Sequence, residues 1–204
     1  MEIILLAESH VFTDDSDREI SIPEIEALPG YPNQYARFVY CLGYGERNLT
    51  KNKLHPKRDG TPPFWKIFFS CNNLINSSQG FSPILRKTPF EQRLNNKINL
   101  LKALKEKGIW LVDTSIVGLY KNGKKVPGMF QAMEKSWHLY TCDVVKSASP
   151  NHIICVGKGV AGVVKNDLQK HFPNNYSVVS QPTAFLSSEE HMENFKHFSK
   201  ICYK

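Results

Sequence analysis

Near the start of the chain stands the stretch Ile3–His10, which reads IILLAESH. Its first five residues are apolar or small, as is typical of a strand buried on both faces of a parallel sheet. Three polar residues follow at once, Glu8, Ser9 and His10. Ligands of open α/β sheets bind beyond the carboxyl ends of the strands, so we expect these three residues to be catalytic. A first strand followed by an ordinary polar loop is the alternative that this stretch leaves open.

Two more apolar runs are predicted as buried strands, at residues 109–113 (IWLVD) and 152–156 (HIICV), and residues 176–180 (YSVVS) are predicted as a fourth strand. Apolar residues at helical spacing predict helices at about 89–107, 129–147, 158–171 and 188–201. Strands that alternate with helices indicate an α/β fold, with three α/β/α layers around a four-stranded, mostly parallel sheet. We expect a single domain over residues 1–204, because this length suits one core.

Residues 11–33 are predicted as a long loop, which is a candidate lid over a site. They hold the acidic run 13–17 (TDDSD) and several helix-breaking Pro and Gly residues. Loops beyond about 15 residues are often functional. The acidic run could hold a hard cation, but no calcium-loop pattern follows it, so a solvated acidic loop is favoured. Residues 34–42 show helical spacing again and are predicted as a helix.

The composition is that of a globular protein, with 41% hydrophobic and 22% charged residues. No apolar run approaches the roughly 18–20 residues that span a bilayer, and the first residues lack a signal-peptide pattern. We therefore expect a cytoplasmic protein without a membrane partner. Five widely spaced cysteines with no Cys-x-x-Cys pair predict buried thiols rather than disulfides, and we expect no metal site. The oligomeric state stays open.

Charge is distributed unevenly along the chain. Residues 1–30 carry eight acids and one arginine, a net charge of −7. Because the whole chain carries +7, residues 31–204 carry a net charge of +14. A basic body of this kind is compatible with DNA as a partner, because Lys and Arg neutralise phosphates and release counterions. The acidic residues 14–26 would repel phosphates if they lay in a groove.

A G-x-G-x-x-G motif lies at residues 157–162 (GKGVAG), between a predicted strand and a predicted helix. A dinucleotide site is disfavoured, because such turns normally follow the first strand and because no acid ends the next strand to hold a ribose. Two readings remain: small residues that let the helix pack on the sheet, or a phosphate bound by Lys158 at the helix N-terminus. We expect no cofactor. A hydrolase triad is disfavoured too, because Ser9 and His10 point opposite ways and no Gly-x-Ser-x-Gly elbow is present.

Polar residues close three predicted strands: Glu8–His10, Asp113 and the run 181–185 (QPTAF). In these residues the chain resembles the uracil-DNA glycosylase superfamily, whose four-stranded parallel sheet reads a flipped base at its strand ends. The first motif of that family, Gly-x-Asp/Asn/Ala-Pro, falls on residues 7–10. Its base-reading Asn falls on Asp113, and its late His-Pro-Ser-Pro-Leu motif falls on residues 181–185, where Pro182 agrees literally.

The resemblance implies that Asp113, Gln181 and Thr183 bind the substrate. Phe185 occupies the place of the wedge residue that fills the gap left by an extruded nucleotide, although burial in the core is an equal alternative. An ionised Asp113 accepts hydrogen bonds but donates none, which suits a base edge that presents amino groups.

Ser9 stands where the family has an activating Asp or Asn, and Gln181 stands where it has a His. The negative charge that a glycosylase needs would then come from Glu8 or from a lid acid such as Asp14. The sequence thus favours a divergent DNA glycosylase that recognises or excises a damaged base. An inactive nucleic-acid-binding or regulatory protein with the same fold, and an enzyme acting on free nucleotides, are the alternatives.

Overall fold

A computed structural model describes residues 1–54, 60–76, 80–182 and 185–203. The chain groups into two compact units, each described here by itself. We call Met1–Phe12 with Leu104–His197 the sheet unit, and Thr13–Ala103 with Phe198–Lys204 the insert unit. The expectation of one domain over residues 1–204 stays a prediction.

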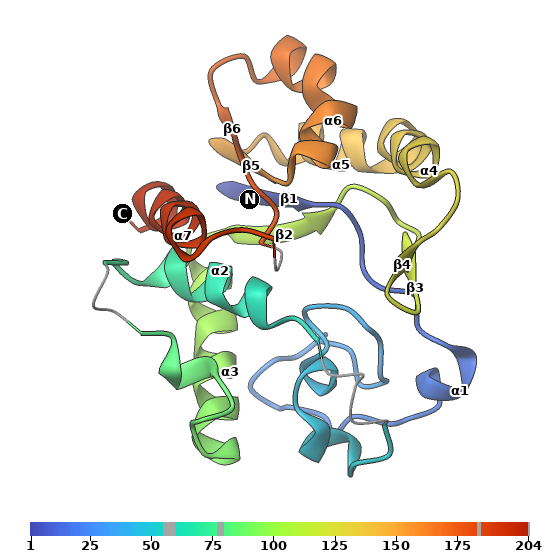
Figure 1. Cartoon of the computed structure of the whole chain (residues 1–204), viewed down its shortest axis with the longest axis vertical. Coiled ribbons are helices and arrows are strands. Elements are labelled where there is room, and N and C mark those ends of the chain that lie inside the picture. The colour runs from blue at the N-terminus through green and yellow to red at the C-terminus, as the bar shows by residue number, and fades with distance from the viewer. Residues whose placement is uncertain (55–59, 77–79, 183–184, 204) are drawn as a thin grey trace. The chain divides into compact units, whose positions relative to one another are not determined.

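The sheet unit is built on a parallel sheet with the strand order β2-β1-β5-β6 (Figure 1). The strands are Ile3–Ala7 (β1), Ile109–Asp113 (β2), His152–Val156 (β5) and Tyr176–Val179 (β6). They match the four predicted strands closely. The register pairs Ala7 with Asp113 and Val156 with Val179, so the carboxyl ends of all four strands lie at one edge. Residues 3–6 of β1 pair with strands on both sides, which explains why this strand is apolar throughout.

Helices cover one face of this sheet. They are Met129–Ser136 (α4), a π-helical turn at Trp137–Thr141 (η5), Cys142–Ala148 (α5) and Lys158–His171 (α6). Ile4 and Leu6 of β1 point to this face and join a buried cluster with Met133, Trp137 and Val164. Because strand side chains alternate, residue 8 continues along the same face past the end of the strand.

The last helix, Ser188–Cys202 (α7), lies on the other side of the sheet along residues 188–197 (Figure 1). The ring of His197 bonds the hydroxyl of Ser177 in β6, at 2.8 Å. A capping box starts the helix, since the Glu190 amide donates to the hydroxyl of Ser187 and the Ser187 amide donates to the Glu190 carboxylate. The prediction of an α/β fold with a parallel four-stranded sheet flanked by helices is therefore confirmed.

The sheet unit also contains a small hairpin after β2, formed by Tyr120–Lys121 (β3) and Lys124–Lys125 (β4). The insert unit holds the helices Asp15–Arg18 (α1) and Pro62–Asn72 (α2) and most of Phe90–Glu106 (α3), as far as Ala103. It also holds short 3-10 turns at Leu42–Tyr44 (η1), Arg47–Thr50 (η2) and Ser82–Ile84 (η4). No described helix is long and apolar enough to cross a membrane. All five cysteine side chains are buried thiols, as their spacing predicts.

Two expectations for the insert unit are wrong. Residues 34–42 form no helix; Tyr35 and Val39 are buried from irregular backbone, where the Tyr35 amide donates to the carbonyl of Ile20. A helix of nine residues is marginal unless packing favours it, and here non-helical hydrogen bonds compete. The acidic run is also less solvated than expected, because Arg37 is buried beside the carboxylates of Asp14 and Asp17, at 3.5 and 3.3 Å.

Candidate functional site

The side chain of Glu8 marks the site at the carboxyl edge of the sheet. Glu8 directly follows β1 and is only 6% exposed. Its Oε2 accepts a hydrogen bond from the hydroxyl of Tyr120 at 2.5 Å and another from Nε2 of Gln181 at 3.3 Å. These donors come from β3 and from the segment after β6. Charged acceptors bind donors more strongly than neutral ones, so two donors hold this buried carboxylate in place.

Tyr120 stays protonated in this arrangement. Burial raises the pKa of its hydroxyl, and the hydrogen bond and negative charge of Glu8 raise it further. The hydroxyl is therefore a permanent donor to the carboxylate at neutral pH.

The other carboxylate oxygen of Glu8 is oriented differently. Within the described residues, Oε1 accepts no hydrogen bond. A Cβ placed on Gly159 would lie 3.2 Å from this oxygen and 3.3 Å from the ring of Phe130 in α4. Oε1 thus faces the start of α6 beside an aromatic ring that is 50% exposed. Of the two carboxylate oxygens, Oε1 is therefore the one that no described residue engages.

The glycine motif explains how α6 comes so close to the carboxylate. Gly157 has a φ of +122°, which a residue with a side chain rarely adopts. Gly159 leaves the space beside Glu8 open, whereas a Cβ on Gly162 would meet nothing within 4 Å. Gly157 and Gly159 therefore allow the start of α6 to lie close to Glu8 at the sheet edge. The third glycine of the motif has no packing role of this kind.

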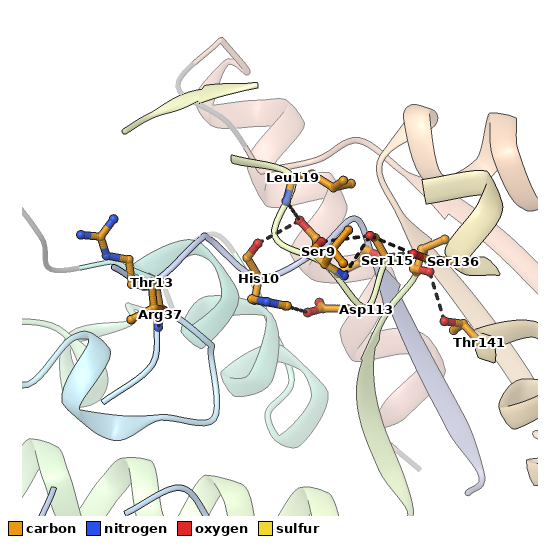
Figure 2. Close-up of polar contacts among 12 residues, drawn as sticks. Ser9, His10, Thr13, Arg37, Asp113, Ser115, Leu119, Ser136 and Thr141 are labelled. Atoms are coloured by element: carbon orange, nitrogen blue, oxygen red, sulfur yellow. Dashed lines mark hydrogen bonds and ion pairs between the residues drawn. The ribbon is translucent and has the colours of Figure 1, made fainter. Parts of the chain in front are cut away.

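The second predicted carboxylate belongs to a separate cluster. Asp113 pairs with Ala7 in the sheet register, so its side chain lies on the face opposite to that of Leu6 and Glu8. Its Oδ2 lies 3.3 Å from Nδ1 of His10, as Figure 2 shows. His10 is partly exposed and forms an ion pair with Asp113 whenever its ring is protonated.

Ser9 is held by the backbone around it. Its hydroxyl donates to the carbonyl of His10 at 2.9 Å and accepts from the amide of Leu119 at 3.0 Å (Figure 2). The pair Ser9 and His10 forms no nucleophile–base contact, in agreement with the sequence expectation. The arrangement ties the segment after β1 to the segment that leads into the β3–β4 hairpin.

Small hydroxyl side chains fix the end of β2 in the same way. Thr114 donates from both its amide and its hydroxyl to the carbonyl of Ala7, at 2.8 and 2.7 Å. The hydroxyl groups of Ser115 and Ser136 lie 3.3 Å apart, and Thr141 donates to the carbonyl of Thr114 (Figure 2). These buried contacts hold the strand ends rigidly, as a site on a sheet edge requires.

Cations and aromatic rings surround the site. Lys158 is exposed at the first residue of α6. Lys125 of β4 lies with its ammonium 5.8 Å from the centre of the Phe130 ring, and Lys121 lies 4.8 Å from that of Phe12. Phe185 is 96% exposed, so its side chain is not part of the core. Thr183 lies outside the described residues.

Tyr120 and Phe130 were not among the predicted site residues. Tyr120 lies seven residues after Asp113, outside every strand, helix and motif predicted from the sequence. Phe130 starts a helix whose apolar spacing suggested burial. The helical spacing could have indicated Phe130, because Met129 and Met133 are four residues apart and share the buried face, at 4% and 0% exposure. Phe130 does not share that face.

Comparison with known proteins adds no relative: neither protein-family models, nor curated proteins, nor solved structures gave a match to this chain.

The chemistry open to this edge follows from its charges. A fixed carboxylate with one open oxygen can accept a proton from a bound water, or stabilise a positive charge that develops on a substrate. An exposed aromatic ring beside it can stack on a planar ring, and nearby ammonium groups can contact phosphates.

Proposed function

We propose that this chain is a divergent relative of the uracil-DNA glycosylases that accepts a flipped nucleotide at the carboxyl edge of its sheet and hydrolyses the N-glycosidic bond. The observation that carries the proposal is the carboxylate of Glu8, which is buried, held on one oxygen by Tyr120 and Gln181, and open on the other. The position of the family's activating Asp or Asn is Ser9 here, and Glu8 supplies the charge from the adjacent residue.

In the proposed reaction a water molecule attacks C1′ of the flipped nucleotide. The water oxygen forms a bond to C1′ while the bond from C1′ to the base nitrogen breaks, and the electron pair leaves with the base. Oε1 of Glu8 accepts a proton from the water, and its negative charge stabilises the cationic sugar in the transition state. The departing base is protonated by solvent.

The remaining residues would position the nucleotide. Phe130 is a stacking surface for the base, and Phe185 is the wedge that enters the duplex. Asp113, which the family resemblance would assign to the base edge, lies on the opposite face of the sheet beside His10 and is not given a base contact in this proposal. Lys158, Lys121 and Lys125 are suited to phosphate contacts, which would place DNA along this edge of the sheet unit.

The decisive experiment is a panel of duplex oligonucleotides that carry uracil, hypoxanthine, xanthine or an amino-bearing damaged base. Alkali-induced strand breakage at the lesion reports excision. We expect breakage for at least one lesion, and a loss of about 100-fold or more for Glu8→Gln, because removal of a catalytic charge typically costs several kcal/mol. Glu134→Gln, at an exposed position of α4, is the matched control. Excision that is unchanged by Glu8→Gln would refute the assignment of the site.

One observation favours a second function. The Ser9 hydroxyl donates to one backbone group and accepts from another, so the position of the family's activating Asp or Asn has a structural role here. A protein that binds a damaged base without excising it would keep such a site. Tight binding to one lesion duplex, with no strand breakage at any lesion, would select this function over the enzyme.

A further inference from the structure

The insert unit contains a cavity that is separate from the residues described above. It has a volume of about 330 Å³ and lies among α2, η4, α3 and the backbone at Gly45. Apolar side chains form much of its wall, namely Pro62, Trp65, Ile84 and Leu85. This volume is at the lower end of the range for pockets that bind small molecules.

A buried ion cluster forms the charged wall of the cavity. The Glu46 side chain is 1% exposed. Arg93 of α3 donates to both of its carboxylate oxygens, with Nε–Oε1 and Nη2–Oε2 distances of 2.7 and 2.6 Å. Lys97, one turn further along α3, donates to Oε1 at 2.7 Å. Two cations thus contact the same carboxylate.

The contacts of Lys97 join the charged wall to the apolar one. Its ammonium lies 4.8 Å from the centre of the Trp65 ring, so α3 and α2 lie side by side here (Figure 1). Lys97 itself is 4% exposed. Glu46 offsets much of the charge of Lys97, so the sign of the field in the cavity depends on whether the lining carries more cations than acids.

The rim adds further positive charge. Arg86 and Lys87 line the cavity after η4, and both are exposed. Among the described lining residues the cations are Arg86, Lys87, Arg93 and Lys97, and the acid is Glu46. The lining therefore carries a formal charge of +3, on walls that are otherwise largely apolar.

We propose that this cavity binds a small organic anion, with a phosphate or carboxylate group directed at Arg93 and Lys97 and an aromatic or aliphatic body against Trp65 and Leu85. The charge selects an anion, and the apolar walls select a ligand with more than a bare ionic group. The proposal is independent of the glycosylase assignment, because all of its residues belong to the insert unit.

Calorimetric titration of the full chain tests the proposal with defined probes. The probes are 1-naphthyl phosphate, 1-naphthoate, neutral 2-naphthol and inorganic phosphate. We expect one or both naphthyl anions to bind at least about 10-fold more tightly than 2-naphthol or inorganic phosphate. Only the naphthyl anions combine an anionic group for the charged wall with an aromatic ring for the apolar wall. Equal binding of inorganic phosphate and the naphthyl anions, or no binding of either anion, would overturn the proposal.

Charge reversal at the rim locates the bound anion. The double variant Arg86→Glu/Lys87→Glu should weaken binding of the naphthyl anion about 10-fold, because two favourable charges become repulsive. Lys51→Glu/Lys53→Glu is the matched control, since it changes the net charge equally at exposed positions outside the cavity. Equal weakening by both variants would contradict binding in the cavity. So would a rim effect confined to a short DNA duplex, which would make the rim a DNA contact.

Glu46→Gln gives a second readout. Without the carboxylate, Arg93 and Lys97 lack their acid, and a bound anion can replace it. A naphthyl anion should therefore raise the melting temperature of this variant by more than it raises that of the wild type. A rise no larger than that of the wild type would contradict the proposal. If Glu46→Gln fails to fold, the comparison of Arg86→Glu/Lys87→Glu with its control tests the proposal instead.

Discussion

The hydroxyl of Tyr120 lies 2.5 Å from Oε2 of Glu8, and this contact joins residues 112 positions apart in the chain. It connects the end of β1 to the β3–β4 hairpin and fixes the carboxylate at the centre of the candidate site. The hairpin, which also carries Lys121 and Lys125, is therefore part of the site.

Tyr120→Phe removes this hydrogen bond while the ring remains. We expect a fall in the free energy of unfolding of about 1–3 kcal/mol, because a buried carboxylate loses a donor. We also expect a loss of excision or lesion binding of about 10-fold or more, because Glu8 is less firmly held. Urea unfolding and the lesion assay measure the two effects. Tyr140→Phe, at a position 53% exposed, should change neither, and an unaltered Tyr120→Phe protein would mean that the contact does not support the site.

Two glycines of α6 provide a matched pair of alanine variants. Gly159→Ala places a methyl group 3.2 Å from Oε1 of Glu8, where it obstructs the open oxygen, so activity or lesion binding should fall. Gly162→Ala meets nothing within 4 Å and should stabilise the helix by about 0.5–1 kcal/mol without an effect on function. Thermal unfolding and the lesion assay distinguish them. Similar functional losses in both variants would argue that the helix as a whole, rather than the space beside Glu8, is what matters.

Lysines near the site should control the salt dependence of DNA binding. Lys121→Gln/Lys125→Gln is expected to reduce the slope of log K against log salt by about 0.9 for each phosphate contact that is lost. Lys165→Gln/Lys170→Gln removes the same charge from exposed positions further along α6. Fluorescence anisotropy between 50 and 200 mM salt, within the range where such slopes are usually measured, compares the variants. Identical slopes for the two double variants would place the DNA on another surface.

Glu46 should make stability depend on acid pH. Burial acts to raise its pKa, but the hydrogen bonds and charges of Arg93 and Lys97 outweigh burial, and the pKa lies below its ordinary value of 4.5. The stabilisation is therefore complete above about pH 4.5 and is lost as the pH falls further, because the unfolded chain takes up the proton first.

Urea unfolding from pH 7 to pH 3 measures this dependence. Glu46→Gln should lose about 3–5 kcal/mol at pH 7, since two buried cations lose their acid, and the deficit should shrink as the pH falls below 4.5. Glu134→Gln should keep the wild-type pH dependence. A deficit in Glu46→Gln that stays constant down to pH 3 would show that the charge of Glu46 is not what stabilises the fold.

Local patterns in the chain were sufficient for most of the fold. The apolar runs of β1 and β5 specify strands buried within the parallel sheet, whereas β2 and β6 are edge strands and Val178 of β6 is exposed. Helical spacing gave α3, α6 and α7 nearly to their ends. Residues 34–42 were predicted wrongly, because their apolar spacing reflects burial from an irregular segment whose backbone bonds elsewhere.

Of the candidate site, the sequence predicted the sheet edge and two residues that meet there, Glu8 and Gln181. Strand order and register brought the ends of β1, β2 and β6 to one edge, as expected, but alternation put Glu8 and Asp113 on opposite faces. Tyr120, Gly159 and Phe130 joined Glu8 from three other segments. Such partners depend on how elements far apart in sequence pack together, because a side chain's neighbours in space are set by strand register and helix docking. Periodicity describes which face of an element is buried, and only the tertiary structure decides what that face meets.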